Sequence, residues 1–183
     1  LGDVYKRQAP ILKEINMRIM FGEKVVITGK NGIGKTTFLK TILGLIPSLG
    51  GTIKMPEYNK IVYYSQEMDE RGDITPFDYI KDAYPKMDDK DVRSLLNRYG
   101  ITSDLVIKPI NKLSGGEISK VRFAKLSLED SNLLILDEPT NNLDKIAKEF
   151  LFESIENYPG TVILVSHEKE FYKKLKMKEI HFS

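Results

Sequence analysis

Apolar residues along this chain follow two different periods that alternate with each other. Residues 24–28 form a β-branched run that suits a buried strand, and residues 36–45 place Phe38, Leu39 and Ile42 at helical spacing. The same two patterns predict further strands at 61–64, 133–137, 161–165 and 178–182 and further helices at 114–128 and 145–158. Because strand and helix alternate, we expect a largely parallel sheet covered by helices.

Two regions interrupt this alternation. Gly50-Gly51 and Pro56 punctuate a short β region that ends in the predicted strand at 61–64. Residues from about 76 to 100 read instead as two helices, with apolar side chains on one face of the second and with loops rich in Asp and Lys. This stretch predicts a small helical lobe within the α/β pattern.

The predicted strand at 24–28 runs directly into a glycine-rich loop, whose sequence is Gly29-Lys30-Asn31-Gly32-Ile33-Gly34-Lys35-Thr36-Thr37. Glycines let such a loop wrap tightly, so that its N–H groups point at phosphate oxygens beside the partial positive charge of a helix N-terminus. Lys35 would neutralise β- and γ-phosphate oxygens, Thr36 would offer its hydroxyl to Mg²⁺, and Thr37 would offer one to the phosphates. A turn without a ligand is the alternative, whereas a dinucleotide-binding loop has the different spacing G-x-G-x-x-G.

A pair of carboxylates ends the predicted strand at 133–137. Apolar residues before Asp137 bury the strand, so Asp137 and Glu138 emerge at the carboxyl edge of the sheet, where open α/β folds bind ligands. Asp137 would hold Mg²⁺ directly or through water, and Glu138 would polarise the attacking water as a general base. Such a pair alone is equally well explained as a helix cap or a solvated turn, but the phosphate loop earlier in the chain favours the catalytic interpretation.

Two more polar residues follow predicted strands. Gln66 comes after the strand at 61–64, where its amide oxygen would ligate Mg²⁺ while the amide contacts the nucleophilic water. His167 comes after the strand at 161–165, where its imidazole would hydrogen-bond the γ-phosphate. Each residue taken alone has a plain explanation, as a surface glutamine or a structural histidine, and it is their place at strand ends that favours function.

The run Leu113-Ser114-Gly115-Gly116-Glu117 opens the predicted helix at 114–128. The Ser114 hydroxyl, the free N–H groups of the first turn and the helix dipole would together bind a phosphate. The same residues also suit a capping box, in which Ser114 and Glu117 satisfy each other's backbone N–H groups. The two interpretations are compatible.

This ordered set of motifs, from about Ile11 to Phe182, resembles the ATP-binding cassette (ABC) superfamily. The resemblance implies an α/β fold, a P-loop NTPase of the ABC type, with a mostly parallel sheet core, a small antiparallel β region and a helical subdomain at about residues 70–128. It implies a single nucleotide-binding domain over residues 9–183 that binds and hydrolyses ATP with Mg²⁺. In this architecture two cassettes sandwich ATP head to tail, so Ser114, Gly115, Gly116 and Glu117 would contact ATP held by a second cassette.

The runs at 137–144 and 158–167 look most like subfamily F, whose soluble tandem-cassette proteins act on ribosomes. We therefore expect one cassette, most like the C-terminal one, of a translation factor or of an antibiotic-resistance protein that protects the ribosome. The chain departs from that pattern at Asn142, where His is usual, at Glu168, where Asp is usual, and in carrying no long charged linker. An ATPase subunit that docks on a membrane permease is the alternative, and a non-hydrolysing structural cassette is disfavoured by the intact motifs.

Composition changes this picture little. The 183 residues, 41% of them hydrophobic, suffice for one sizeable core. The 28 basic and 26 acidic side chains are too balanced for bulk electrostatics to indicate nucleic-acid binding, so any such contact would have to be local. The basic run at 173–178 is better explained as a solvated helix end or loop, and a nucleic-acid contact there is the alternative. The chain has no cysteine and no apolar run near the roughly 20 residues that span a bilayer, which fits a cytoplasmic protein.

The first residues stand apart from the rest. Residues 1–8 resemble translated adaptor sequence, so native sequence is expected to begin near Ala9. Tyr5 lies roughly where ABC proteins place an aromatic side chain against adenine, but it falls within this stretch. The sequence therefore assigns no residue to adenine stacking.

Overall fold

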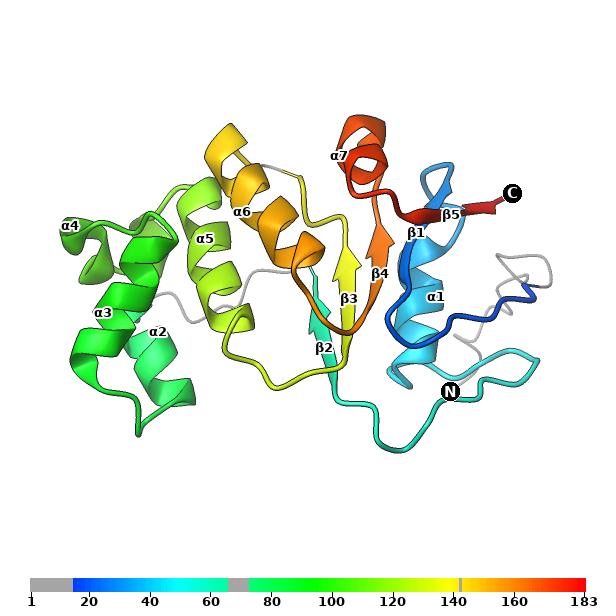
Figure 1. Ribbon diagram of the computed structural model, residues 1–183, viewed down its shortest axis with the longest axis horizontal. Helices are drawn as coiled ribbons and strands as arrows, with labels where there is room; N and C mark the ends of the chain where they lie inside the picture. Colours follow the sequence, from blue (N-terminus) through cyan, green and yellow to red (C-terminus); the bar gives the residue numbers. More distant parts are fainter. Residues whose placement is uncertain (1–14, 66–72, 142) are drawn as a thin grey trace, which may run out of the picture. The chain divides into compact units, whose positions relative to one another are not determined.

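The computed structural model describes residues 15–65, 73–141 and 143–183, and within these ranges five parallel strands form one sheet. The strands are β1 (Lys24–Gly29), β2 (Ile61–Tyr64), β3 (Leu133–Asp137), β4 (Thr161–Val165) and β5 (Lys178–Phe182). Their order across the sheet is β2-β3-β4-β1-β5, and each neighbouring pair is parallel (Figure 1). The parallel sheet predicted from the sequence is confirmed, and the carboxyl ends of its strands lie at one edge.

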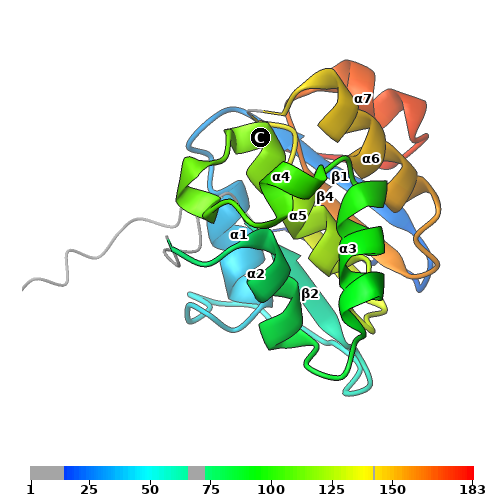
Figure 2. The ribbon, with the colours of Figure 1, turned by 90° about the vertical axis from the view of Figure 1, so that its left-hand side faces the viewer.

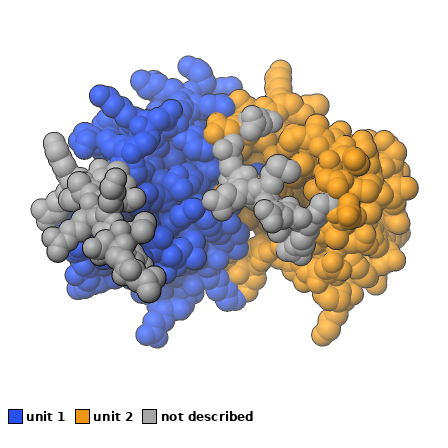
Figure 3. Space-filling view, turned by 180° about the vertical axis from the view of Figure 1, so that it is seen from behind, with its two compact units in different colours: residues 1–64, 132–138, 160–183 blue, residues 65–131, 139–159 orange. Residues whose placement is uncertain are grey.

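The described chain divides into two compact units, coloured separately in Figure 3. The first unit contains the described residues up to Tyr64, Asn132–Glu138 and Gly160–Ser183, and therefore the whole sheet. Helices α1 (Lys35–Ile42) and α7 (Lys169–Lys174) also belong to it. Leu39 of α1 packs in one buried cluster with side chains of β1, β3, β4 and β5, and the Phe38 and Phe182 rings meet edge to face at 5.1 Å. This core fixes the loop between β1 and α1 against the sheet.

The second unit is helical and contains Ser65–Ser131 and Pro139–Pro159 (Figure 2). Its elements are α2 (Pro76–Ala83), α3 (Asp89–Arg98), α4 (Ser103–Val106), the 3₁₀ turn η1 (Ile110–Lys112), α5 (Gly115–Leu126) and α6 (Lys145–Glu156). The two helices predicted between about 76 and 100 are α2 and α3. Apolar residues from α2, α3, α4 and α5 form the core of this unit. It therefore carries a hydrophobic core distinct from the one beside the sheet.

Local sequence sets where the helices of this unit begin. The Thr75 hydroxyl accepts a hydrogen bond from the Asp78 N–H at 3.1 Å, and Pro76, at the first helical position, has no N–H that needs an acceptor. Asp144 caps α6 by accepting from the Ala147 N–H at 2.7 Å. These caps satisfy N–H groups that the first turn of a helix leaves without partners.

Some expected features differ in the structure. The predicted helix at 145–158 ends at Glu156, with Asn157 as its C-terminal cap. The small antiparallel β region has no counterpart in the described ranges, where residues 51–60 form turns and irregular chain and β2 pairs in parallel with β3. Gly50, Gly51 and Pro56 disfavour a paired strand there, because Pro lacks a donor and Gly favours turns. In the described part of the chain, no helix combines the length and the apolar character that crossing a bilayer requires.

Candidate functional site

The glycine-rich loop lies between β1 and α1, as predicted. Its backbone uses positive φ angles at Gly29 (145°), Gly32 (76°) and Gly34 (101°), which side chains with a Cβ rarely adopt. A Cβ at Gly29 would also lie 2.6 Å from the Phe182 carbonyl oxygen. The glycines therefore let the loop wrap tightly and let β1 pass close to β5.

Lys35 is buried at the first position of α1 and bends back over this loop. Its ammonium donates hydrogen bonds to the carbonyl oxygens of Gly29 at 2.9 Å and Lys30 at 3.1 Å. Gly34, at the N-cap, provides no side-chain cap for the first turn, so the N–H groups of that turn have no hydroxyl or carboxylate acceptor at the cap. Thr36 and Thr37 are exposed beside it. An ammonium, uncapped N–H groups and hydroxyls form a suitable site for the phosphates of a nucleotide.

Asp137 ends β3 and is buried, with 6% of its surface exposed. The Tyr63 hydroxyl donates to Oδ2 over 3.4 Å, a long hydrogen bond, and within the described chain Oδ1 has no hydrogen-bond partner. A buried carboxylate oxygen without a partner is costly and requires an explanation. A hard cation such as Mg²⁺ would satisfy it, with the exposed Thr36 hydroxyl as a second oxygen ligand, so the donor set fits this ion.

Glu138 follows Asp137 and adopts a left-handed backbone, with φ at 47°. Its N–H donates to the Val165 carbonyl oxygen at 2.9 Å, which extends the β3–β4 pairing by one residue. The side chain then meets His167, whose Nε2 lies 3.0 Å from Glu138 Oε1. A non-glycine residue in this region is strained by about 1 kcal/mol or more, and such strain is concentrated at functional sites.

Burial raises the pKa of the Glu138 carboxyl above its ordinary value, and the charge of Asp137 adds to this rise. His167 and Lys35 oppose the rise, because positive charge and a hydrogen bond from the His167 N–H favour the carboxylate. The net direction is upward, so the carboxylate of Glu138 is a stronger base than an exposed one. This is the direction that suits a residue that accepts a proton from water.

The predicted turn Ser114-Gly115-Gly116-Glu117 opens α5 in the second unit. The Ser114 hydroxyl accepts from the Glu117 N–H at 3.3 Å, and a Glu117 carboxylate oxygen accepts from the Ser114 N–H at 2.8 Å. The predicted capping box is therefore present. Ser114 and Gly115 are exposed, whereas Gly116 is buried, so the turn presents its hydroxyl and first N–H groups outward while its second glycine packs inward.

The sequence-predicted residues of the first unit thus gather at one edge of the sheet: the loop at 29–37, Asp137, Glu138 and His167. Gln66 lies outside the described residues, as do Tyr5 and Asn142. Sequence reasoning did not include Tyr63, which contacts Asp137 from the neighbouring strand. No local pattern in the sequence indicates this contact, because it depends on β2 pairing with β3.

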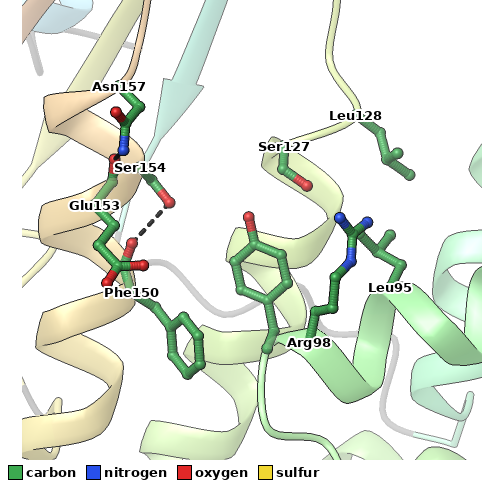
Figure 4. A pocket seen from close by; sticks show the side chains of 9 residues that line it. Leu95, Arg98, Ser127, Leu128, Phe150, Glu153, Ser154 and Asn157 are labelled. Carbon is green, nitrogen blue, oxygen red and sulfur yellow. Dashed lines mark hydrogen bonds between the residues drawn. The ribbon is translucent and has the colours of Figure 1, made fainter.

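A hollow of about 420 Å³ also lies in the helical unit, between α3, α6 and the end of α5 (Figure 4). Arg98 and Glu153 bring opposite charges to it, and the rings of Tyr99 and Phe150, which also line it, lie 5.4 Å apart. It contains none of the residues predicted to act on a nucleotide. We therefore treat it as a notch where three helices meet.

Comparison with known proteins is consistent with this geometry. The family described as ABC transporter matches residues 12–141. The ABC transporter ATP-binding protein YfmM of Bacillus subtilis is 39% identical over 164 residues, which cover 90% of this chain and 32% of that protein. ABC transporter F family member 2 of Arabidopsis thaliana is 39% identical over 168 residues, covering 90% and 25%.

Among solved structures, the archaeal ribosome recycling factor aABCE1, in complex with the ribosomal stalk protein aP1, is similar at a TM-score of 0.67 and 28% identity. The match covers 88% of this chain and 32% of that one. The chain thus spans about a quarter to a third of the length of the relatives that it matches.

Proposed function

We propose that this chain works as one of two cassettes that close around ATP. The premise is that the chain belongs to the ABC transporter family and is an ATP-binding and ATP-hydrolysing domain. One observation carries the proposal: Lys35, Asp137 and Glu138 lie at the carboxyl edge of one sheet, each in surroundings that suit its role. Lys35 covers the phosphate loop, Asp137 keeps a buried oxygen without a partner among the described residues, and Glu138 meets His167.

The roles of the site residues follow from their chemistry. The loop at 29–37 would hold the phosphates through its N–H groups and the Lys35 ammonium. Glu138 would accept a proton from the attacking water, and His167 would orient Glu138 and hydrogen-bond the γ-phosphate. Gln66 would contact the same water through its amide.

Thr36, Asp137 and Gln66 would hold Mg²⁺ by oxygen atoms. When bound, the ion would neutralise charge that develops on the phosphate oxygens. The place of Asp137 in β3 and its contact with the Tyr63 hydroxyl support this role. Asp137 would then be in position as one ligand before nucleotide arrives.

The exposed turn at 114–117 supports the need for a second cassette. Its capping box leaves the Ser114 hydroxyl and the first N–H groups of α5 facing outward, where they suit the phosphates of a nucleotide bound to another cassette. ATP hydrolysis would then require two cassettes to associate, because each ATP site would need the 114–117 turn of the other cassette.

We further propose that this chain is one cassette, most like the C-terminal one, of a longer tandem-cassette protein that acts on the ribosome. The names of two relatives support this: one is an F family member, and the other is a ribosome recycling factor solved with a ribosomal stalk protein. The whole protein would be a translation factor or a ribosomal protection protein that confers antibiotic resistance, and it would act in the cytoplasm. A permease-docked ATPase subunit is the alternative, which rests on the family match alone.

Sedimentation of the chain with purified ribosomes tests the ribosome part of this proposal. The Glu138→Gln variant with ATP and Mg²⁺ should pellet with ribosomes, whereas the same variant with ADP should stay in the supernatant. Glu138→Gln combined with Lys35→Ala is the matched control and should not pellet with ATP. Equal pelleting in all three samples, or none in any, would contradict ribosome binding under the control of nucleotide.

A further inference from the structure

Helix α7 and the turn after it carry four lysines that the nucleotide site does not use. All four are exposed: Lys169, Lys173, Lys174 and Lys176. Within the described residues, none of their side chains takes part in a hydrogen bond or an ion pair, whereas Lys178 pairs with Glu23 at 3.3 Å. We name these four lysines the α7 patch. A nucleic-acid contact in this basic run is the alternative that the sequence leaves open.

The inner side of α7 is held by two aromatic side chains. Phe171 and Tyr172 are buried, with 7% and 5% of their surface exposed. The Tyr172 hydroxyl also donates to Glu179 Oε1 over 3.5 Å, a long hydrogen bond that ties α7 to β5. The helix is therefore anchored from within, and its lysines occupy the solvent side.

Lys169 stands where the stability of the helix does not favour a positive charge. It is the first residue of α7, and no side chain caps the turn that it begins. This end of a helix carries partial positive charge, so an ammonium there is unfavourable. Lys173 lies one turn further on, and like charges four residues apart also repel. Only Lys173 and Lys174, in the last turn, are favoured by the helix dipole.

Lys176 occupies a backbone position that favours glycine. Leu175 caps α7, and Lys176 follows it with a φ of 51° and an N–H that donates to the Lys173 carbonyl oxygen at 3.1 Å. Glycine is the usual residue here, because a left-handed backbone strains side chains with a Cβ. Lys169 and Lys176 therefore both have a local cost, and both add positive charge to the same exposed surface. Such costs are concentrated at functional sites.

The chemistry of the patch favours phosphate over carboxylate or lipid. Its cations are all lysines, which bind phosphate as point charges, and the chain has no arginine after Arg122. Protein interfaces are enriched in Arg and depleted in Lys. The structure describes all of residues 166–183, and none of the exposed large apolar side chains lies there, although a membrane-binding surface needs such side chains. A nucleic-acid backbone requires neither arginine forks nor apolar side chains.

We propose that the α7 patch binds the phosphate backbone of RNA without reading its sequence. Contacts of lysine with phosphate carry no base information and release counterions, so binding should be independent of sequence and should weaken steeply with salt. The inference rests on the proposed ribosome role, for which it names a surface that meets RNA. Glu170 is exposed on the same helix, and its negative charge opposes the binding.

The fluorescence anisotropy of a short labelled single-stranded RNA, titrated with the chain at several KCl concentrations, tests the patch. The triple variant Lys169→Gln, Lys173→Gln, Lys174→Gln removes three charges and keeps long polar side chains. The slope of log affinity against log salt should then fall in magnitude by about 2, since each phosphate contact on a single strand contributes about 0.7. Affinity at low salt should fall about tenfold or more.

A second triple variant matches this change of charge in the helical unit. It replaces three exposed lysines with Gln, namely Lys86, Lys90 and Lys112. Because the net charge of the two triple variants is the same, any effect of overall charge is common to both. The control variant should keep RNA affinity within about twofold of the parent. Equal losses in the two triple variants would contradict a local site.

Two single substitutions separate charge from folding. Lys176→Gly removes a charge and relieves the left-handed strain, so RNA affinity should fall about two- to threefold while the midpoint of thermal unfolding stays or rises. Glu170→Gln should raise RNA affinity about twofold, because it removes the opposing charge. RNA affinities equal to that of the parent in both variants would contradict the proposal.

The RNA titration and the ribosome sedimentation can fail separately. RNA binding that depends on the patch, in a chain that never pellets with ribosomes, would uphold the patch and remove the ribosome proposal. Pelleting with ribosomes, together with RNA binding that the patch variant leaves unchanged, would overturn the patch alone. The patch is also overturned if the parent does not bind RNA at low salt. A larger loss of binding to polyglutamate or to phosphatidylserine vesicles than to RNA would overturn RNA as the partner.

Discussion

The His167 Nε2 atom lies 3.0 Å from Glu138 Oε1, and this pair joins the ends of two neighbouring parallel strands. Asp137 pairs with Val165 in the β3–β4 register, so Glu138 and His167 emerge together just beyond the last paired residues. The left-handed backbone of Glu138 turns its side chain at this point. The pairing of two strands and one strained residue thus places a carboxylate and an imidazole in contact.

Removing the charge of Glu138 should stop hydrolysis and spare binding. Glu138→Gln keeps the shape of the side chain but cannot accept a proton, so ATP turnover should fall by about 100-fold or more. Affinity for ATP should stay within a few-fold of the parent, as measured with a fluorescent analogue. Glu153→Gln, on the outer part of α6, is the matched control and should hydrolyse ATP normally. Undiminished turnover in Glu138→Gln would remove this residue from the role of base.

The raised pKa of Glu138 has consequences for stability. A carboxyl whose pKa is higher in the folded state contributes stability that is fully present below the unfolded pKa and is lost as pH rises through the folded pKa. At neutral pH the buried carboxylate is therefore a cost. Glu138→Gln should raise the midpoint of thermal unfolding at pH 7 and lose that advantage at acidic pH, as calorimetry across pH would measure. A variant less stable than the parent at pH 7 would contradict the direction of the shift.

The same pKa shapes the pH profile of activity. Because Glu138 must be ionised to act as a base, turnover should rise with pH over a range displaced above the ordinary pKa of a glutamate carboxyl. His167→Ala removes one of the groups that hold this pKa down, so the range should move further up. A profile recorded at saturating ATP checks this, and an unmoved range in His167→Ala would show that the imidazole does not act on Glu138.

The chain contains two histidines, so substitution of His181 is a control for substitution of His167. His167→Ala should lower turnover by about tenfold or more. His181 lies on β5, with β4 and β1 between it and the strand that Glu138 follows, and its Nδ1 is 3.1 Å from the Thr28 hydroxyl. His181→Ala should therefore keep turnover within about twofold. Losses of equal size in the two variants would mean that the effect is structural.

Lys35 should control nucleotide affinity. Lys35→Ala removes a charge-assisted contact to phosphate, so the dissociation constant for ATP should rise about tenfold or more. Lys40 lies in the last turn of the same helix, and Lys40→Ala is the control that should bind as the parent does. Calorimetric titration with ATP measures both. Unchanged affinity in Lys35→Ala would contradict the assignment of the phosphate loop.

Gly29 should resist substitution for a steric reason. An added Cβ would lie 2.6 Å from the Phe182 carbonyl oxygen, and the φ of 145° is one that side chains rarely adopt. Gly29→Ala should destabilise the chain by about 1–3 kcal/mol. Gly50 has no atom within 4 Å of its ideal Cβ, so Gly50→Ala is the control and should be near neutral in a denaturant titration.

The sequence alone predicted those structural features that depend on residues close together in the chain. The strands at 133–137 and 161–165 have the predicted bounds, because fully buried parallel strands read as unbroken apolar runs. The capping box at Ser114 and Glu117 was also predictable, since both partners lie within one turn.

Contacts between distant parts of the chain were not predictable in this way. The Tyr63 bond to Asp137 depends on the β2–β3 register, and the ion pair between Lys120 and Asp144 depends on how α5 meets α6. The spacing of apolar and polar residues along the sequence indicates neither of these two contacts. The left-handed φ of Glu138 likewise follows from the end of β3 and not from the propensity of Glu.

Light scattering coupled to size exclusion on the Glu138→Gln chain tests the central claim most directly. With ATP and Mg²⁺ the chain should have the mass of a dimer, and with ADP or without nucleotide that of a monomer. Ser114→Arg in the same background should remain a monomer with ATP while it still binds the nucleotide. A single mass under all these conditions, or an ATP dimer that Ser114→Arg leaves intact, would contradict the account of two cassettes that close around ATP.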